Sequence, residues 1–330
     1  MTQRRMMLIV NPIAGSVARH DAAGFVRREA EALGYDVTVC ETTHVGHAVE
    51  LARQAVAENY YSVVACGGDG TVNEVACGVC GSRVIMGIIP LGSGNGLARH
   101  LGIPLTVPGA MKVIAENRIL EADYGEANGR PFFCTFGLGF DANVTDKFNS
   151  QQFTGRGLIN YLRAVFEEIL SYKSERYTII ADGRAMTEDA MLVACCNASQ
   201  YGNNAFIAPH ASLKDGLLDV TIVHKGNLLN TMRAGVEVLT GLVGSSGTVS
   251  TFQARNIRIE RKSEGPAHYD GEPATLPGIV DITCRNAGLR LYSTEKKQKL
   301  KAMLAPEIPV LSPFLLLMRD IRFRIFNLFS

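Results

Sequence analysis

The chain has 330 residues, of which 47% are hydrophobic and 20% are charged, so it holds enough apolar material for two domains. Its formal net charge of +1 gives no reason to expect a nucleic acid as partner. The first apolar run, Met6–Val10, is too short for a signal peptide, and the 8 cysteines lack the spacing of a disulfide framework or a zinc site, which favours a cytoplasmic protein with reduced thiols.

The first 125 residues alternate short apolar runs with amphipathic stretches. The apolar runs predict buried parallel strands at Met6–Val10, Tyr35–Cys40, Ser62–Cys66 and Ile85–Pro90. The amphipathic stretches predict helices at Val17–Leu33, Val45–Glu58 and Val72–Val79. This alternation is typical of an open, mainly parallel α/β sheet, which binds ligands at the carboxyl ends of its strands. We therefore predict an α/β domain over residues 1–125.

Residues 126–292 change to runs in which apolar and polar side chains alternate. Strands are predicted at Pro131–Phe136, Tyr177–Ala181, Met191–Cys196, Leu218–Val223, Ile257–Glu260, Val280–Thr283 and Leu289–Tyr292. Asp-Gly pairs at 182–183, 215–216 and 270–271 favour hairpin turns, and helices are predicted only at Leu158–Leu170 and Leu228–Leu242. The pattern predicts a second, β-rich domain of the sandwich type that packs against the first with a cleft between them.

Residues 293–330 combine basic charge with a helical pattern of apolar side chains. Between Glu295 and Arg324, seven basic residues stand against three acidic ones, a net +4 that leaves −3 for the rest of the chain. Apolar residues recur at three- and four-residue steps through Phe314–Phe329. We expect residues 314–329 to form an amphipathic helix on an anionic membrane surface. The alternative is a helix that docks on the protein itself.

The most informative motif is the sequence CGGDGTVNEV at residues 66–75. A predicted buried strand ends in glycines there, and a helix is predicted directly after them. Glycines let backbone N–H groups approach a polyphosphate closely, and a helix N-terminus adds partial positive charge. The carboxylate of Asp69 would repel phosphate, but it is explained if it holds Mg²⁺ or accepts a hydroxyl proton. A plain Asp-Gly turn is the structural alternative.

Two further loops follow neighbouring predicted strands. The sequence PLGSGNGLAR at residues 90–99 again exposes backbone, with Ser93 and Asn95 as hydrogen-bond partners, although its glycine spacing matches neither the Walker nor the Rossmann pattern. Asn11, Pro12 and Gly15 follow the first predicted strand. By contrast, His44, His47 and His100 have no partner at ligand spacing, and we expect surface or capping roles for them.

In this order the loops resemble the diacylglycerol kinase catalytic-domain family, which includes bacterial diacylglycerol kinase-like lipid kinases, sphingosine kinases and ceramide kinases. The resemblance continues through LKDGLLD at residues 213–219 and DGEP at residues 270–273, so it covers the chain to about residue 292. NAD kinases share the first glycine motif. The combination with the last two motifs is more specific.

The resemblance implies an ATP-dependent lipid kinase that phosphorylates a hydroxyl of diacylglycerol or of a sphingoid long-chain base at a membrane surface. It places the nucleotide in residues 1–125 and the lipid pocket in residues 126–292. The nucleotide-binding residues that it implies are Asn11, Thr42, Gly67, Gly68, Asp69, Gly70, Thr71, Val72, Asn73, Ser93, Gly94 and Asn95.

The resemblance also implies Asp69 and Glu272 as catalytic residues. Bacterial members are described with the residue at Glu272 as proton acceptor and sphingosine kinases with the one at Asp69, so both assignments stay open. Besides the Mg²⁺ that accompanies the nucleotide, a second, structural Mg²⁺ would be held by Asp215 with groups of Ser212 and Leu217. For Asp215, a simple turn is the alternative.

One departure from the bacterial pattern concerns the second glycine loop. Bacterial members usually have Thr and then Asn-Asp where this chain has Ser93 and Asn95-Gly96, so a carboxylate that some relatives use is missing. This favours a long-chain base slightly. Two other functions fit parts of the pattern: a kinase for a soluble substrate, like NAD kinases, and a non-catalytic lipid-binding protein of the same fold. The specific lipid, the nucleotide and the oligomeric state stay open.

Overall fold

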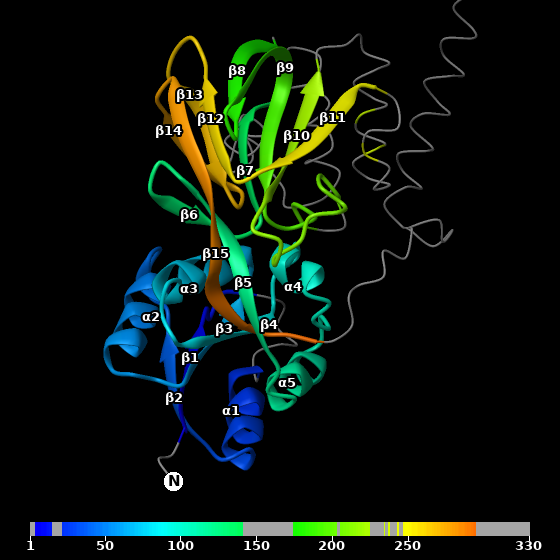
Figure 1. The fold of residues 1–330 in the computed structure, drawn as a ribbon. Helices are drawn as coiled ribbons and strands as arrows, with labels where there is room; N and C mark the ends of the chain where they lie inside the picture. Colours follow the sequence, from blue (N-terminus) through cyan, green and yellow to red (C-terminus); the bar gives the residue numbers. More distant parts are fainter. Residues whose placement is uncertain are drawn as a thin grey trace, which may run out of the picture. The chain divides into compact units, whose positions relative to one another are not determined.

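The computed structural model describes residues 4–14, 22–140, 174–202, 205–224 and 247–294, together with positions 234, 237 and 243. The predicted helix at Leu158–Leu170, most of that at Leu228–Leu242, Gly15 and the segment 314–329 lie outside these residues. These residues form two lobes, an α/β lobe and a β lobe (Figure 1).

The α/β lobe is built on a parallel sheet. Its first four strands are β1 (Arg4–Val10), β2 (Tyr35–Glu41), β3 (Ser62–Gly67) and β4 (Ile85–Pro90), in the order β2-β1-β3-β4. All residues of β3 and β4 are buried, as expected of strands covered on both faces. The four predicted strands are therefore confirmed to within two residues at either end.

Helices cover both faces of this sheet. They are α1 (Ala22–Ala32), α2 (His47–Ala57), α3 (Asp69–Val79), α4 (Gly96–His100) and α5 (Val107–Ala115). Helices α2 and α3 contact each other on one face, and α1 contacts α5 on the other (Figure 1). The sequence pattern had indicated α1, α2 and α3, although α3 begins three residues earlier than predicted, at Asp69.

The β lobe contains short antiparallel strands around its own apolar core. They are β6 (Arg130–Phe132), β7 (Thr135–Gly139), β8 (Glu175–Ala181), β9 (Arg184–Cys196), β10 (Leu218–His224), β11 (Val249–Ala254), β12 (Asn256–Glu260), β13 (Gly265–Tyr269) and β14 (Glu272–Leu276). Strand β9 pairs with β8 through its first half and with β7 and β10 through its second. The strand thereby connects two layers that enclose Phe136, Tyr177 and Ile259.

Two long strands run antiparallel between the lobes, namely β5 (Ile119–Ala127) and β15 (Ile279–Tyr292) (Figure 1). Strand β15 begins beside β12 and ends beside β4, to which it is parallel. Two separate strands, Val280–Thr283 and Leu289–Tyr292, were predicted where β15 runs. They form one strand with an irregularity between Arg285 and Leu289, where Ala287 has a φ of 50°. The predicted domain boundaries stay predictions, and the end of β15 contributes to the first sheet.

A buried carboxylate of β5 holds this irregularity in place. Asp123 accepts hydrogen bonds from the backbone N–H of Ala287 through Oδ1, at 2.8 Å, and of Gly216 through Oδ2, at 2.7 Å. The N–H of Asp123 donates to the carbonyl of Leu213 at 2.7 Å. One residue therefore fixes the loop 212–217 to β5 and β15.

We expect Asp123→Ala to destabilise the protein by about 2–5 kcal/mol, because the buried N–H of Gly216 and the partly buried N–H of Ala287 lose their acceptor. The free energy of unfolding in urea measures this effect. The matched control is Glu121→Ala on the same strand, where 65% of the side chain is exposed and the change should stay within about 0.5 kcal/mol. Equal unfolding midpoints for the two variants would contradict the anchoring role of Asp123.

Candidate active site

The carboxyl ends of β1, β3 and β4 bring three loops to one edge of the parallel sheet. Gly68 precedes the first residue of α3, and the loop after β4 crosses it directly. A Cβ atom on Gly92 would lie only 2.7 Å from the Cα of Gly68, so glycine allows the two backbones to touch. This edge, formed by residues 67–71 and 91–95, is called the glycine edge below.

The carboxylate of Asp69 joins the two loops of the glycine edge. Its Oδ2 accepts the backbone N–H of Asn95 at 2.8 Å, and its Oδ1 accepts that of Gly96 at 2.7 Å. Asn95 takes a left-handed conformation with a φ of 52°, and its side chain donates to the carbonyl of Gly92 at 2.7 Å. Asp69 thus fixes the second loop against the first, while each carboxylate oxygen keeps a further lone pair for a ligand.

The loop after β1 reaches the same edge through Asn11. Its backbone N–H donates to the carbonyl of Cys66 at 3.0 Å, and its side-chain amide donates to Thr71 Oγ1 at 3.3 Å. Thr42 follows β2, and its N–H donates to the carbonyl of Val10 at 2.8 Å. The side chain of Ser93 is exposed on the loop after β4. These predicted nucleotide-binding positions therefore follow strands β1 to β4 at a single sheet edge.

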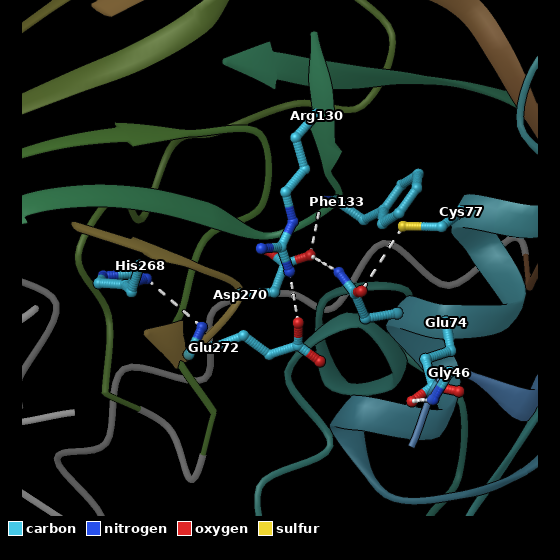
Figure 2. A network of polar contacts seen from close by, with 10 residues as sticks. Gly46, Glu74, Cys77, Arg130, Phe133, His268, Asp270 and Glu272 are labelled. Atoms are coloured by element: carbon cyan, nitrogen blue, oxygen red, sulfur yellow. Dashed lines mark hydrogen bonds and ion pairs between the residues drawn. The ribbon is translucent and has the colours of Figure 1, made fainter. Parts of the chain in front are cut away.

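Other members of the first motif have different environments. The side chain of Val72 is buried, so this residue can offer only its backbone to a ligand. Gly70 is exposed on the first turn of α3. The carboxylate of Glu74 accepts the N–H groups of Gly46 at 2.9 Å and Ala48 at 3.1 Å, which stabilises the start of α2 (Figure 2). Glu74 therefore has a structural role.

Asn73 and Asp270 connect α3 to the β lobe. The side-chain amide of Asn73 donates to Asp270 Oδ2 at 2.7 Å. The same carboxylate accepts three successive backbone N–H groups, of Phe133, Cys134 and Thr135, at 2.8, 2.7 and 2.8 Å. Enclosure raises the pKa of Asp270, and its hydrogen bonds oppose this shift.

Asp270 also begins a hairpin turn between β13 and β14, as predicted. Its φ is 50° and that of Gly271 is 86°, two left-handed values in succession that suit a type I′ turn. Glu272 follows directly as the first residue of β14, with 38% of its side chain exposed and an ion pair to Arg130. The sequence pattern predicted the turn. It predicted neither the hydrogen bond from Asn73 to Asp270 nor the ion pair of Arg130 with Glu272.

The loop 212–217 offers oxygen ligands of the kind that Mg²⁺ prefers. Asp215 Oδ1 accepts the N–H of Leu217 at 3.1 Å, and Ser212 Oγ accepts that of Lys214 at 3.3 Å. Within the described part of the chain, no three His, Cys, Asp or Glu side chains gather as a metal site. One carboxylate with carbonyl and hydroxyl oxygens fits an ion that keeps several of its waters.

His100, at the end of α4, is a residue whose environment the sequence analysis did not anticipate. Its Nδ1 accepts the backbone N–H of Ser199 at 3.0 Å and lies 2.9 Å from the hydroxyl oxygen of the same residue. Burial lowers the pKa of His100 to about 4. His100 is thus partly buried, and its neutral ring links α4 to the β lobe by accepting a backbone N–H group, a contact of the capping kind.

The models of two protein families match the chain. "Diacylglycerol kinase catalytic domain" matches residues 5–127, and "YegS C-terminal NAD kinase beta sandwich-like domain" matches residues 135–292. A Staphylococcus aureus protein named diacylglycerol kinase is 30% identical over 272 residues, which are 82% of this chain and 86% of that protein. A Bacillus subtilis protein of the same name is 28% identical over 279 residues, 83% of this chain and 92% of that protein.

Solved structures have the same fold. A crystal structure of a diacylglycerol kinase from Bacillus anthracis str. Sterne matches with a TM-score of 0.70 at 21% identity. The match covers 89% of this chain and 98% of that chain. It confirms the predicted combination of a mainly parallel α/β domain with a β-rich domain.

We expect Asp69→Asn to lower kcat about 100-fold or more, because an amide in either orientation turns one N–H group toward the N–H of Asn95 or Gly96. The glycine edge then loses the fixed geometry that a phosphate site needs. Steady-state kinetics with saturating substrates measures the loss. Asp36→Asn, an exposed carboxylate on β2, is the control. Retention of more than about a tenth of wild-type activity by Asp69→Asn would contradict this role.

The environment of His100 makes stability depend on pH. The unfolded chain binds the proton near pH 6.5, whereas the folded protein binds it only near pH 4. The free energy of unfolding should therefore fall as the pH decreases from 6.5 to 4. In His100→Gln this decrease should be shallower, with the exposed His44→Gln as control. The free energy of unfolding is measured by urea titration at each pH. If it changed with pH equally in the wild type and in His100→Gln, the proposed coupling of stability to His100 protonation would be excluded.

Proposed function

The chain belongs to the diacylglycerol kinase catalytic-domain family, and on this premise we propose that it transfers the γ-phosphoryl group of ATP to a lipid hydroxyl. Diacylglycerol or a sphingoid long-chain base is the acceptor. The observation that supports this most directly is the hydrogen bond from Asn73 to Asp270. It connects the helix that begins at the glycine edge to the turn that carries Glu272.

The glycine edge suits the triphosphate. The first N–H groups of a helix have no acceptor within it, so those at the start of α3 are free to bind phosphate oxygens. Gly68 and Gly92 let the two loops pack closely, which brings their backbone N–H groups together at this edge. Because Asp69 fixes both loops, little reorganisation is needed when the nucleotide binds, and positioning supplies much of the rate in phosphoryl transfer.

Glu272 is the better of the two candidates for proton acceptor. Both oxygens of Asp69 already accept backbone N–H groups, whereas among the described residues only Arg130 contacts the carboxylate of Glu272. Glu272 is also partly exposed and can reach a bound hydroxyl. In this proposal Glu272 takes the hydroxyl proton and Asp69 organises the nucleotide loops.

Mg²⁺ bound with the nucleotide would neutralise charge on the phosphates, as in other phosphoryl transfers. The remaining lone pairs of Asp69 are suited to hold it. Asp215, with Ser212 and Leu217, would hold a second, structural ion in the loop 212–217. This loop keeps its place through the bond from Gly216 to Asp123.

We further propose that the enzyme acts at the membrane surface as a peripheral, cytoplasmic protein. Among the described residues, no helix has the length and apolar character needed to cross a bilayer. The basic, amphipathic segment 314–329 would bind anionic lipid headgroups and bring the site to its insoluble substrate.

The proposal is tested by incubating the protein with radiolabelled ATP, Mg²⁺ and mixed micelles of diacylglycerol or sphingosine, with the product identified by mass spectrometry. We expect a phosphorylated lipid, and a loss of about 100-fold or more in kcat for Glu272→Gln with the substrate KM values nearly unchanged. Glu264→Gln, another carboxylate of the β lobe, is the control. Phosphorylation of NAD in place of lipid would favour the soluble-substrate alternative. No labelled product with either acceptor would favour a non-catalytic lipid-binding protein.

A further inference from the structure

Two hairpin turns of the same kind present Arg130 and Glu272 to each other. The first turn, between β5 and β6, has left-handed values at Asn128 (φ 47°) and Gly129 (φ 81°). The second is the turn at 270–271 described above. In each hairpin the first residue of the returning strand is charged, Arg130 in β6 and Glu272 in β14.

The contacts around Arg130 form a closed ring across the two hairpins. Arg130 pairs across its hairpin with Ala127, and Glu272 pairs across its own with Tyr269. Arg130 Nη2 forms an ion pair with Glu272 Oε2 (Figure 2). The hydroxyl of Tyr269 donates to the carbonyl of Ala127 at 3.0 Å, which closes the ring.

The guanidinium of Arg130 stacks on the ring of Tyr269. Its central carbon lies 4.4 Å from the centre of the Tyr269 ring, a cation–π arrangement. Tyr269 is only 2% exposed, and its ring packs edge-on against Phe136 with the ring centres 5.0 Å apart. The head group of Arg130 therefore rests on the core of the β lobe, unlike that of a lysine, which could not lie flat on the ring.

We propose that Arg130 is a positioning residue for the phosphoryl transfer: it holds one oxygen of Glu272 so that the other faces the acceptor hydroxyl. This inference rests on the proposed function of Glu272. Glutamate on an exposed hairpin has several rotamers, and a misplacement of about 1 Å at such a group commonly costs about 100-fold in rate. Among the described residues no donor contacts Glu272 Oε1, which leaves this atom available to a substrate.

Among the residues described in the β lobe, no other arginine that pairs with a carboxylate lies over an aromatic ring. Arg176 binds Asp189 through two hydrogen bonds of 2.9 and 3.0 Å, with 72% of the Arg176 side chain exposed. Exposed pairs of this kind contribute about 0–1 kcal/mol to stability. Loss of either arginine should therefore leave the protein folded, so an effect on turnover that is confined to Arg130 reports on positioning.

The first measurement compares three variants in the lipid kinase assay. We expect Arg130→Ala to lower kcat about 10- to 100-fold, with the KM values for ATP and lipid changed less than about threefold. Arg130→Lys should keep the charge and recover only part of the rate. Arg176→Ala should equal the wild type. Thermal melting of each variant verifies the fold. A raised KM with unchanged kcat, or wild-type kcat in Arg130→Ala, would overturn the inference.

The second measurement is a double-mutant cycle with Glu272→Gln. If Arg130 acts through Glu272, Arg130→Ala should change the residual kcat of Glu272→Gln less than about threefold. An undiminished effect in that background would mean that Arg130 acts directly on substrate and would overturn the inference. The two proposals also fail separately. Full activity of Glu272→Gln refutes the role of Glu272, whereas an inactive Glu272→Gln beside a fully active Arg130→Ala refutes only the role of Arg130.

Discussion

The side-chain hydrogen bond from Asn73 to Asp270 joins helix α3 of the α/β lobe to the hairpin turn between β13 and β14 of the β lobe. Asn73 lies one turn into α3, whose first residue Asp69 fixes the glycine edge. Asp270 is immobilised by three successive N–H groups at residues 133–135. This 2.7 Å contact therefore links the glycine edge to the turn before Glu272, in addition to the connection that β5, β15 and the ring of His100 make between the lobes.

Three carboxylates in the described part of the chain, those of Asp69, Asp123 and Glu74, bind backbone N–H groups. Asp69 fixes the two glycine loops, Asp123 fixes the loop 212–217, and Glu74 stabilises the start of α2. A carboxylate accepts up to four hydrogen bonds, so a single one can hold a crossing of loops where regular secondary structure supplies no partner. Glu272 differs because its partner is a side chain, Arg130, and no other described residue contacts its second oxygen. That contrast supports a role as proton acceptor for Glu272 and not for the others.

The sequence allowed the architecture and the glycine edge to be predicted because both depend on local patterns. Buried strands such as β3 and β4 are continuous apolar runs, and glycines after a strand indicate a ligand-binding loop whatever the rest of the chain does. The roles of Asp123, Asp270 and Arg130 could not be predicted, because each depends on a partner 93 to 197 residues away. Strands β13 and β14 are short and partly polar, so their pattern resembles that of a loop.

Strand β15 has a consequence for the order of folding during synthesis. Its last residues, Arg290 and Leu291, pair with β4, and the hydroxyl of Tyr292 lies 3.2 Å from that of Tyr35. A nascent chain that has just released residues 1–127 from the ribosome thus has β4 with an open edge, which only the far end of the polypeptide can cover. Until then this apolar edge is a target for chaperones and for mispairing with other chains.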